Sequence, residues 1–130
     1  MTVNRLSEKN LIQIVAGETL KPATCIIKFY SNGCSYCHNL KEYYEQLADS
    51  LANDDTYFFA FNIDDAPVPK QISLNGVPTI CKIKSTYRHR TRQKQKLHVD
   101  IQILKDPPNP DELTWYYPED IFKFVAGMKK

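Results

Sequence analysis

The sequence predicts an α/β fold with a central mixed β-sheet and helices on both faces. Runs rich in β-branched and aromatic residues alternate along the chain with segments of helical periodicity. One such run, residues 24–30, is apolar without alternation, which is typical of a central strand buried on both faces. At 130 residues and 42% hydrophobic content, the chain is expected to form a single domain over residues 1–130.

The N-terminal half is predicted to hold three strands and two helices. A short edge strand at residues 2–6 is followed by a helix that Ser7 caps and Gly17 ends. The apolar face of this helix is formed by Leu11, Ile12, Ile14 and Val15. After the central strand, helical spacing of Leu40, Tyr44, Leu47 and Leu51 predicts a second helix over residues 34–52. Residues 56–63, rich in Phe and Tyr, are predicted to form the third strand.

The C-terminal half is predicted to hold two strands and one helix. Residues 64–75 include two prolines and leave room for at most a short helix. Strands are expected at residues 79–84 and at 97–104, where apolar and polar residues alternate. A proline-rich loop over residues 105–117 leads to a helix of about 118–129, which begins with proline and two acidic residues.

Two cysteines, Cys34 and Cys37, lie where the central strand ends and the second helix begins. Unpaired backbone N–H groups and the positive end of the helix dipole favour a thiolate there, so we expect a lowered thiol pKa. Their spacing allows a small disulfide ring, as thiol–disulfide exchange requires. Cys34 comes first and is expected to be the exposed nucleophile. Cys37, one turn into the helix, is expected to be the resolving thiol.

The strand, the CxxC motif and the helix, followed about forty residues later by Gly76, Val77, Pro78 and Thr79, resemble the thioredoxin superfamily over residues 3–104. The resemblance implies a thioredoxin fold and a protein dithiol–disulfide oxidoreductase that needs no cofactor. It implies that Pro78 is cis and packs beside the cysteines, and that the backbone of Val77 binds an extended substrate peptide. Gly33 and Tyr36 would border the same substrate site.

The chain departs from that family at three positions. Gly33 stands where relatives have an aromatic residue, and Lys28 stands where they often have a buried acid. We expect the long Lys28 side chain to reach solvent, and its ammonium to lower the thiol pKa, or at least not raise it. The Ser35-Tyr36 pair between the cysteines matches neither the Gly-Pro pair of thioredoxins nor the Gly-His pair of protein disulfide isomerases. Tyr36 does match many glutaredoxins, but their Gly-Gly-x-Asp stretch after the cis-proline strand is absent, which favours protein over glutathione chemistry. His38 is expected to be exposed and to tune the thiolate if protonated.

The cysteine pair is also compatible with two other sites. Cys34, Cys37 and His38 also match the C-x-x-C-H haem attachment signature, with Met1 or Met128 as the second axial ligand. A zinc site would need Cys81 or His98 as its fourth ligand, and no second paired motif supports it. We therefore expect no metal. Cys25 and Cys81 fall on two central strands, where core packing is the default and a regulatory disulfide is the alternative.

Charge is unevenly distributed although the net charge is only +2. Residues 82–96, between the last two strands, hold seven Lys or Arg and no acid. This segment is either a solvated hairpin or a docking surface for an acidic protein; a single interleaved tyrosine argues against nucleic acid. The alternative function is thus a binding or adaptor subunit that docks a larger partner through this hairpin. The polar N-terminus and the lack of a long apolar run predict a cytoplasmic protein without membrane contact. A signal peptide that has been removed is the alternative. We also expect a monomer.

Overall fold

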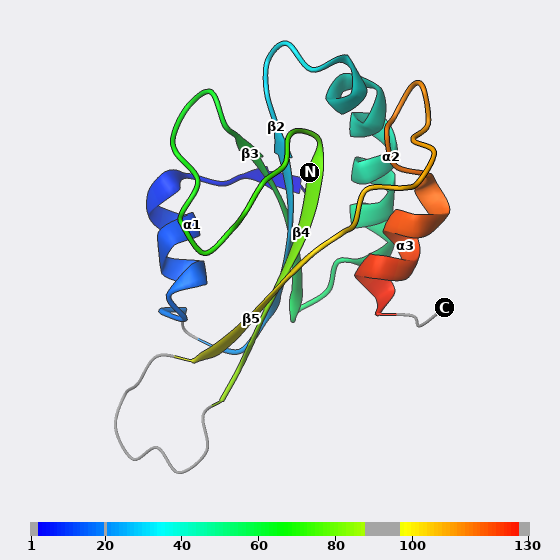
Figure 1. Ribbon diagram of the computed structural model, residues 1–130. Helices are drawn as coiled ribbons and strands as arrows, with labels where there is room; N and C mark the ends of the chain where they lie inside the picture. The colour runs from blue at the N-terminus through cyan, green and yellow to red at the C-terminus, as the bar shows by residue number, and fades with distance from the viewer. Residues whose placement is uncertain (1–2, 20, 88–96, 128–130) are drawn as a thin grey trace.

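A five-stranded mixed β-sheet forms the centre of the computed structural model, which describes residues 3–19, 21–87 and 97–127. The elements are β1 (Val3–Arg5), α1 (Glu8–Val15), β2 (Thr24–Tyr30), α2 (Ser35–Leu51), β3 (Thr56–Asn62), β4 (Thr79–Thr86), β5 (His98–Ile103) and α3 (Pro118–Ala126). The strand order is β1-β3-β2-β4-β5, with β1, β3 and β2 parallel and with β4 antiparallel to both β2 and β5. Helix α1 covers one face and α2 and α3 cover the other (Figure 1), so the predicted mixed sheet with helices on both faces is confirmed.

Strand β2 contributes to the hydrophobic core on both sides of the sheet. Residues 25–29 are all buried. Towards α1, the buried cluster includes Leu11, Ile14, Cys25, Ile27, Phe29, Phe61, Cys81 and Ile83. Towards α2 and α3, it includes Ile26, Leu40, Tyr44, Leu47, Phe58, Ile80, Tyr116 and Ile121. Full burial of one such Ile or Phe contributes about 1.5–3 kcal/mol, so the strand that leads to the CxxC motif is held firmly.

Helix α2 is fixed to the sheet by one buried tyrosine. Tyr44 lies on its apolar face and has no exposed surface. The Tyr44 hydroxyl lies 3.1 Å from the carbonyl oxygen of Ile26 on β2 and 2.7 Å from that of Phe59 on β3. Because a buried hydroxyl is costly unless it is hydrogen-bonded, these contacts select one position of α2 over β2 and β3.

Gly17 ends the first helical segment in the left-handed conformation, with φ of 73°. Its carbonyl accepts a hydrogen bond from the Leu97 N–H at 2.9 Å. A Cβ atom at position 17 would overlap with the Leu97 carbonyl oxygen. Glycine is therefore required here both by backbone conformation and by close approach.

We expect Gly17→Ala to lower the free energy of unfolding by roughly 2–5 kcal/mol, because the left-handed backbone and the overlap are both unfavourable. Gly127→Ala is the matched control, since Gly127 has the same φ of 73° but open space around it. That control is expected to lose only about 1–2 kcal/mol. Urea denaturation measures both variants, and equal losses would show that the contact with Leu97 is unimportant.

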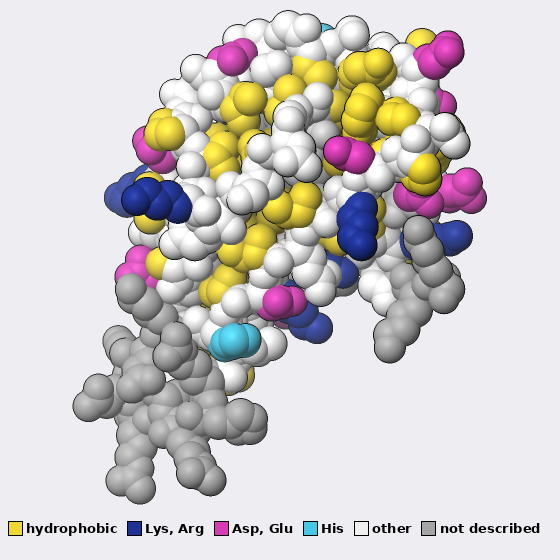
Figure 2. All heavy atoms as spheres, viewed as in Figure 1, with side chains coloured by type: hydrophobic (Ala, Val, Ile, Leu, Met, Phe, Trp, Pro, Cys, Tyr) yellow, Lys and Arg dark blue, Asp and Glu magenta, His cyan; other side chains and the backbone are white. Residues whose placement is uncertain are grey.

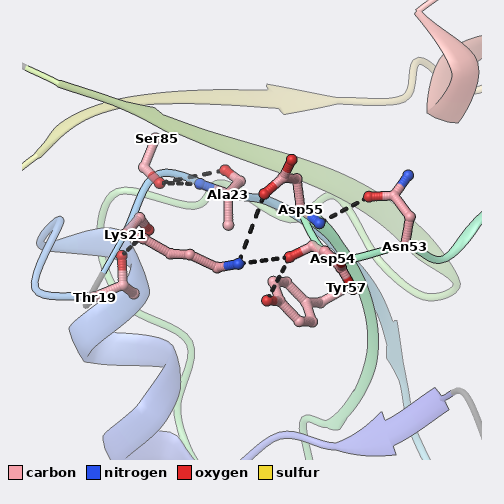
Figure 3. A network of polar contacts seen from close by, with 8 residues as sticks. All are labelled: Thr19, Lys21, Ala23, Asn53, Asp54, Asp55, Tyr57 and Ser85. Carbon is pink, nitrogen blue, oxygen red and sulfur yellow. Dashed lines mark hydrogen bonds and ion pairs between the residues drawn. The ribbon is translucent and has the colours of Figure 1, made fainter.

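A polar network at the end of the sheet where β2 begins links the segment before β2 to neighbouring parts of the chain (Figure 3). The Lys21 ammonium donates to the carbonyl oxygen of Asp54 at 2.9 Å and lies 3.7 Å from the Asp55 carboxylate. The Ser85 hydroxyl accepts from the Ala23 N–H at 2.9 Å. These contacts tie the segment before β2 to the turn before β3 and to β4, and the CxxC motif lies at the opposite end of β2.

The predicted ends of β4 and α3 are corrected by the structure, whereas residues 64–75 agree with the prediction of at most a short helix. Residues 64–75 form a series of turns without a helix, as their prolines favour. Strand β4 extends to Thr86, two residues beyond the prediction, because it pairs with β5 over that length. Helix α3 ends at Ala126 rather than near 129, because Gly127 takes a left-handed cap conformation. None of the helices in the described ranges is long and apolar enough to cross a membrane.

Candidate functional site

The Cys34–Cys37 pair lies at the junction of β2 and α2. Cys34 is the N-cap of α2, and its Sγ accepts a hydrogen bond from the Cys37 N–H at 3.1 Å. The two residues form a disulfide, with Cα atoms 5.2 Å apart. Cys34 is half-buried whereas Cys37 is only 3% exposed. Cys34 is therefore the more accessible sulfur, as predicted, and both the N–H donor and the helix N-terminus favour negative charge on it.

The turn before Cys34 is held by three side chains around Asn32. The Asn32 N–H donates to the Asp64 carboxylate at 2.8 Å, and the Asn62 amide donates to the Asn32 side-chain oxygen at 2.8 Å. The His38 Nε2 lies 3.2 Å from the Asn32 carbonyl oxygen and can donate to it. His38 is exposed, as predicted. The contacts of Asn32 with Asn62 and Asp64 were not predicted, because they join the turn to β3 and the loop that follows.

The Val77–Pro78 peptide bond is cis, which is the isomer that the resemblance implies. Tyr36, Val77 and Pro78 line one cavity of about 160 Å³ at the start of α2. Among the described residues, none forms a hydrogen bond with the N–H or C=O of Val77. Gly33 does not line this cavity; it is exposed, and a Cβ atom there would meet no atom within 4 Å. The structure thus brings Tyr36, Val77 and Pro78 together, whereas Gly33, the fourth predicted substrate-binding residue, lies outside the cavity and is exposed to solvent.

Trp115, from the loop of residues 105–117, also lines this cavity and was missed by the sequence reasoning. Its ring packs edge-to-face against Tyr36 with centroids 5.5 Å apart. Its Nε1 donates to the Asp106 carboxylate at 3.0 Å. Trp115 is the single tryptophan of the chain and lies in a proline-rich loop, which was the available signal, but the sequence did not show where that loop lies.

Lys28 is buried, with 5% of its surface exposed, so the expectation that its side chain reaches solvent is wrong. It projects from β2 towards α2, and its ammonium lies over the rings of Tyr30 and Tyr44, at 5.6 and 5.2 Å from their centroids. These rings attract the cation and replace part of its hydration. Burial lowers the pKa of Lys28 to about 8; the Glu45 carboxylate opposes this change and the Lys41 ammonium adds to it.

Lys28 and Cys37 line the same cavity of about 230 Å³ between β2 and α2. His38 and Lys41 also line it. A cation in a shared cavity favours the thiolate over the thiol. The Lys28 ammonium can therefore act electrostatically on the Cys37 thiol through the cavity that both residues line. The predicted effect of Lys28 on the thiol pKa stays a prediction.

Cys25 and Cys81 are free and buried in the core between the sheet and α1. Burial raises the pKa of Cys25 to about 11, and burial with the neighbouring Cys25 raises that of Cys81 to about 12. Both thiols are thus protonated at neutral pH and inert as nucleophiles. Cys25 borders a cavity of about 580 Å³ between α1 and β3, away from the CxxC motif. Core packing is the role that the structure gives to these two residues.

The zinc set considered from the sequence does not assemble. Within the described ranges, no group of three or more His, Cys, Asp or Glu side chains could hold a metal ion. Cys81 lies in the core on the α1 side, and His98 begins β5. Met1 and Met128, the axial ligands of the haem alternative, lie outside the described residues.

Most of the basic segment, residues 88–96, lies outside the described part of the chain. Of its basic residues, Lys82 and Lys84 are described. Lys82 donates to the Phe124 carbonyl oxygen at 2.8 Å and lies 5.0 Å from the centroid of the Phe124 ring, so it fixes α3 to the sheet. Lys84 is exposed. An acidic partner at this segment stays a prediction.

Comparison with known proteins agrees with the geometry. The thioredoxin family model matches residues 2–103. Chloroplastic thioredoxin z is 18% identical, with a TM-score of 0.60 over 98% of this chain and 94% of that chain. The first thioredoxin domain of mouse protein disulfide-isomerase A4 is 18% identical, with a TM-score of 0.57 over 96% of this chain and 72% of that chain. The J-Trx1 fragment of ERdj5 is 18% identical, with a TM-score of 0.57 over 97% of this chain but 49% of that fragment, so this chain spans about half of its length.

A thioredoxin fold with a CxxC pair at the start of α2 is the arrangement of a thiol oxidoreductase in general. The chain belongs to the thioredoxin family.

Proposed function

We propose that the protein exchanges disulfides with other proteins through the Cys34–Cys37 dithiol. The observation that carries this proposal is the pairing of one accessible sulfur, at the N-cap of α2, with a covered sulfur that already forms a disulfide with it. The first cysteine is the more exposed of the two, which supports its contact with another protein. The second is close enough to attack the first, which supports its role in releasing that protein.

The reaction then takes two steps. The Cys34 thiolate attacks one sulfur of a substrate disulfide, which forms a mixed disulfide and releases the other substrate sulfur as a thiolate. The Cys37 thiolate next attacks the Cys34 sulfur and releases the first substrate sulfur as a thiolate. The substrate gains two electrons, the protein is left as the Cys34–Cys37 disulfide, and the released thiolates take protons from water.

The Val77 backbone supports a polypeptide substrate. Its N–H and C=O have no hydrogen-bond partner among the described residues and lie beside the cavity that Tyr36 and Pro78 line. An extended segment of the substrate can pair with these groups as a short added strand. The open space at Gly33 leaves room for the rest of that segment.

The reaction also needs a partner that restores the starting state. A dithiol reductase would regenerate the reduced pair, whereas an oxidant would run the exchange in the reverse direction, according to the reduction potentials. The adaptor function, through residues 82–96, and the cytoplasmic location stay predictions from the sequence.

The test is to mix the reduced protein with a protein that carries an accessible disulfide and to follow the release of thiols. We expect saturable exchange that is faster than with the same concentration of dithiothreitol. Equilibration of the Cys34–Cys37 couple with glutathione buffers then gives its reduction potential and hence the favoured direction. A rate no higher than that of dithiothreitol would contradict the proposal and favour the adaptor function.

A further inference from the structure

The loop of residues 105–117 is built against the start of α2. It leaves β5, runs beside α2 and leads into α3 (Figure 1). The Asn39 amide on α2 donates to the Leu113 carbonyl oxygen at 2.8 Å, and the Tyr43 hydroxyl donates to the Pro118 carbonyl oxygen at 2.9 Å. The loop therefore has a fixed position next to the cysteine pair.

Trp115 has a strained backbone within this loop. Its φ of 68° is in the left-handed region, which is unusual for a bulky side chain. The conformation is stabilised by reciprocal backbone hydrogen bonds with Asp111, each of 3.0 Å, and by the Asp111 carboxylate, which accepts from the Leu113 N–H at 2.8 Å. Strain of this kind persists where the surrounding structure enforces it and is frequent at ligand sites.

The strained backbone places the indole ring as one wall of the 160 Å³ cavity. Tyr36 packs against it, and both side chains are half-buried. Asp106 accepts the indole N–H and is the charged residue of the cavity lining. Hydrophobic side chains gather over the region of the α2 start and the neighbouring loop (Figure 2). Tyr36, Val77, Pro78 and Trp115 thus form an apolar part of the wall, and Asn75, Thr79 and the Asp106 carboxylate form a polar part.

We propose that this cavity is a selectivity pocket that takes one apolar side chain next to the reactive cysteine of the substrate polypeptide. The inference rests on the proposed function. Trp115 and Tyr36 supply the aromatic surface of the cavity. A volume of about 160 Å³ is below the roughly 300–1,000 Å³ of pockets for drug-sized ligands and suits a single side chain.

Two features select the chemistry of that side chain. An extended segment paired with Val77 directs alternate side chains to one side, where Tyr36 and Trp115 offer aromatic contact area. The Asp106 carboxylate repels a second carboxylate, and the indole N–H is already bound to it. Leucine or phenylalanine is therefore favoured in the pocket, serine less so, and aspartate least.

The test uses a set of symmetrical peptide disulfides that differ only in the two residues flanking the cysteine: Leu, Phe, Ser or Asp. Reduction is followed by chromatography, and bis(2-hydroxyethyl) disulfide serves as a substrate without side chains. The wild-type protein is expected to reduce the Leu and Phe peptides at least about tenfold faster, in kcat/KM, than the Ser peptide. The Asp peptide is expected to be the slowest.

Trp115→Ala is expected to bring the ratio of Leu to Ser rates close to one. Tyr36→Ala, which removes the opposite wall, provides the same test if the first variant does not fold. Phe122→Ala is the matched control, because Phe122 is an aromatic residue of α3 that is 39% exposed and does not line the cavity; it is expected to keep the wild-type ratio.

Equal rates of the wild-type protein with all four peptides, or an unchanged ratio in both pocket variants, would overturn the pocket while leaving the proposed function intact. Failure of the wild-type protein with every disulfide, including bis(2-hydroxyethyl) disulfide, would instead contradict the proposed function and the pocket with it.

Discussion

Replacement of Cys34 by serine is expected to abolish disulfide exchange, whereas Cys37→Ser is expected to attack its substrate and remain joined to it. Cys34 is the accessible N-cap residue whose sulfur accepts the Cys37 N–H, and it is therefore the sulfur favoured as a thiolate. Cys37 is 3% exposed and can reach the Cys34 sulfur but not a protein substrate. Without it, the mixed disulfide has no resolving thiol.

Non-reducing electrophoresis and mass spectrometry of the two variants, mixed with a disulfide-containing protein, measure this difference. The control is Cys25→Ala, which removes a buried thiol outside the site and is expected to retain exchange and trap nothing. A mixed disulfide through Cys37 in the Cys34→Ser variant would reverse the two roles.

Local sequence patterns were sufficient to predict most of the fold. The apolar run of residues 24–30 and the helical spacing after Cys34 are patterns among residues that are close in the sequence. These two patterns were enough to locate the strand–helix junction that holds the cysteine pair. The boundary errors were small, and they arose where strand pairing or a glycine cap decided the end of an element.

The contacts that sequence reasoning missed join residues far apart in the chain. Trp115 contacts Tyr36, although the two residues are far apart in the sequence. The contact depends on the path of the loop that carries Trp115, which no local pattern indicates. Lys28 was expected in solvent because its side chain is long and flexible. In the structure, α2 covers it and two tyrosine rings surround its ammonium. Both features follow from packing between elements, which periodicity does not describe.

Lys28→Met is expected to remove a pH dependence of stability. In the folded protein burial lowers the pKa of Lys28 to about 8, whereas the ordinary value of 10.5 applies to the unfolded chain. Between these values the unfolded state binds more protons, so the free energy of unfolding rises with pH. This contribution is fully present above pH 10.5 and is lost as the pH falls through 8.

The difference between the two pKa values corresponds to roughly 3 kcal/mol in total, of which about 2 kcal/mol falls between pH 7 and about pH 9.5. Urea denaturation at these two pH values is expected to show the wild-type protein gaining this amount relative to Lys28→Met. The comparison cancels groups that titrate in both proteins. Lys41→Met is the control, since Lys41 borders the same cavity but is exposed. If wild type and Lys28→Met change in parallel, the ammonium is not desolvated.

The same replacement is expected to change the redox chemistry at neutral pH, where Lys28 is still mostly protonated. Loss of its cation from the cavity shared with Cys37 should raise the thiol pKa. A higher thiol pKa destabilises the reduced form, so the couple should become more reducing. Alkylation of the reduced protein as a function of pH, and equilibration with glutathione, measure the two effects. If Lys28→Met and Lys41→Met give the same thiol pKa and reduction potential as the wild-type protein, Lys28 contributes only the packing of its aliphatic side chain. The thiol pKa is then set by the N-terminus of α2 and not by Lys28.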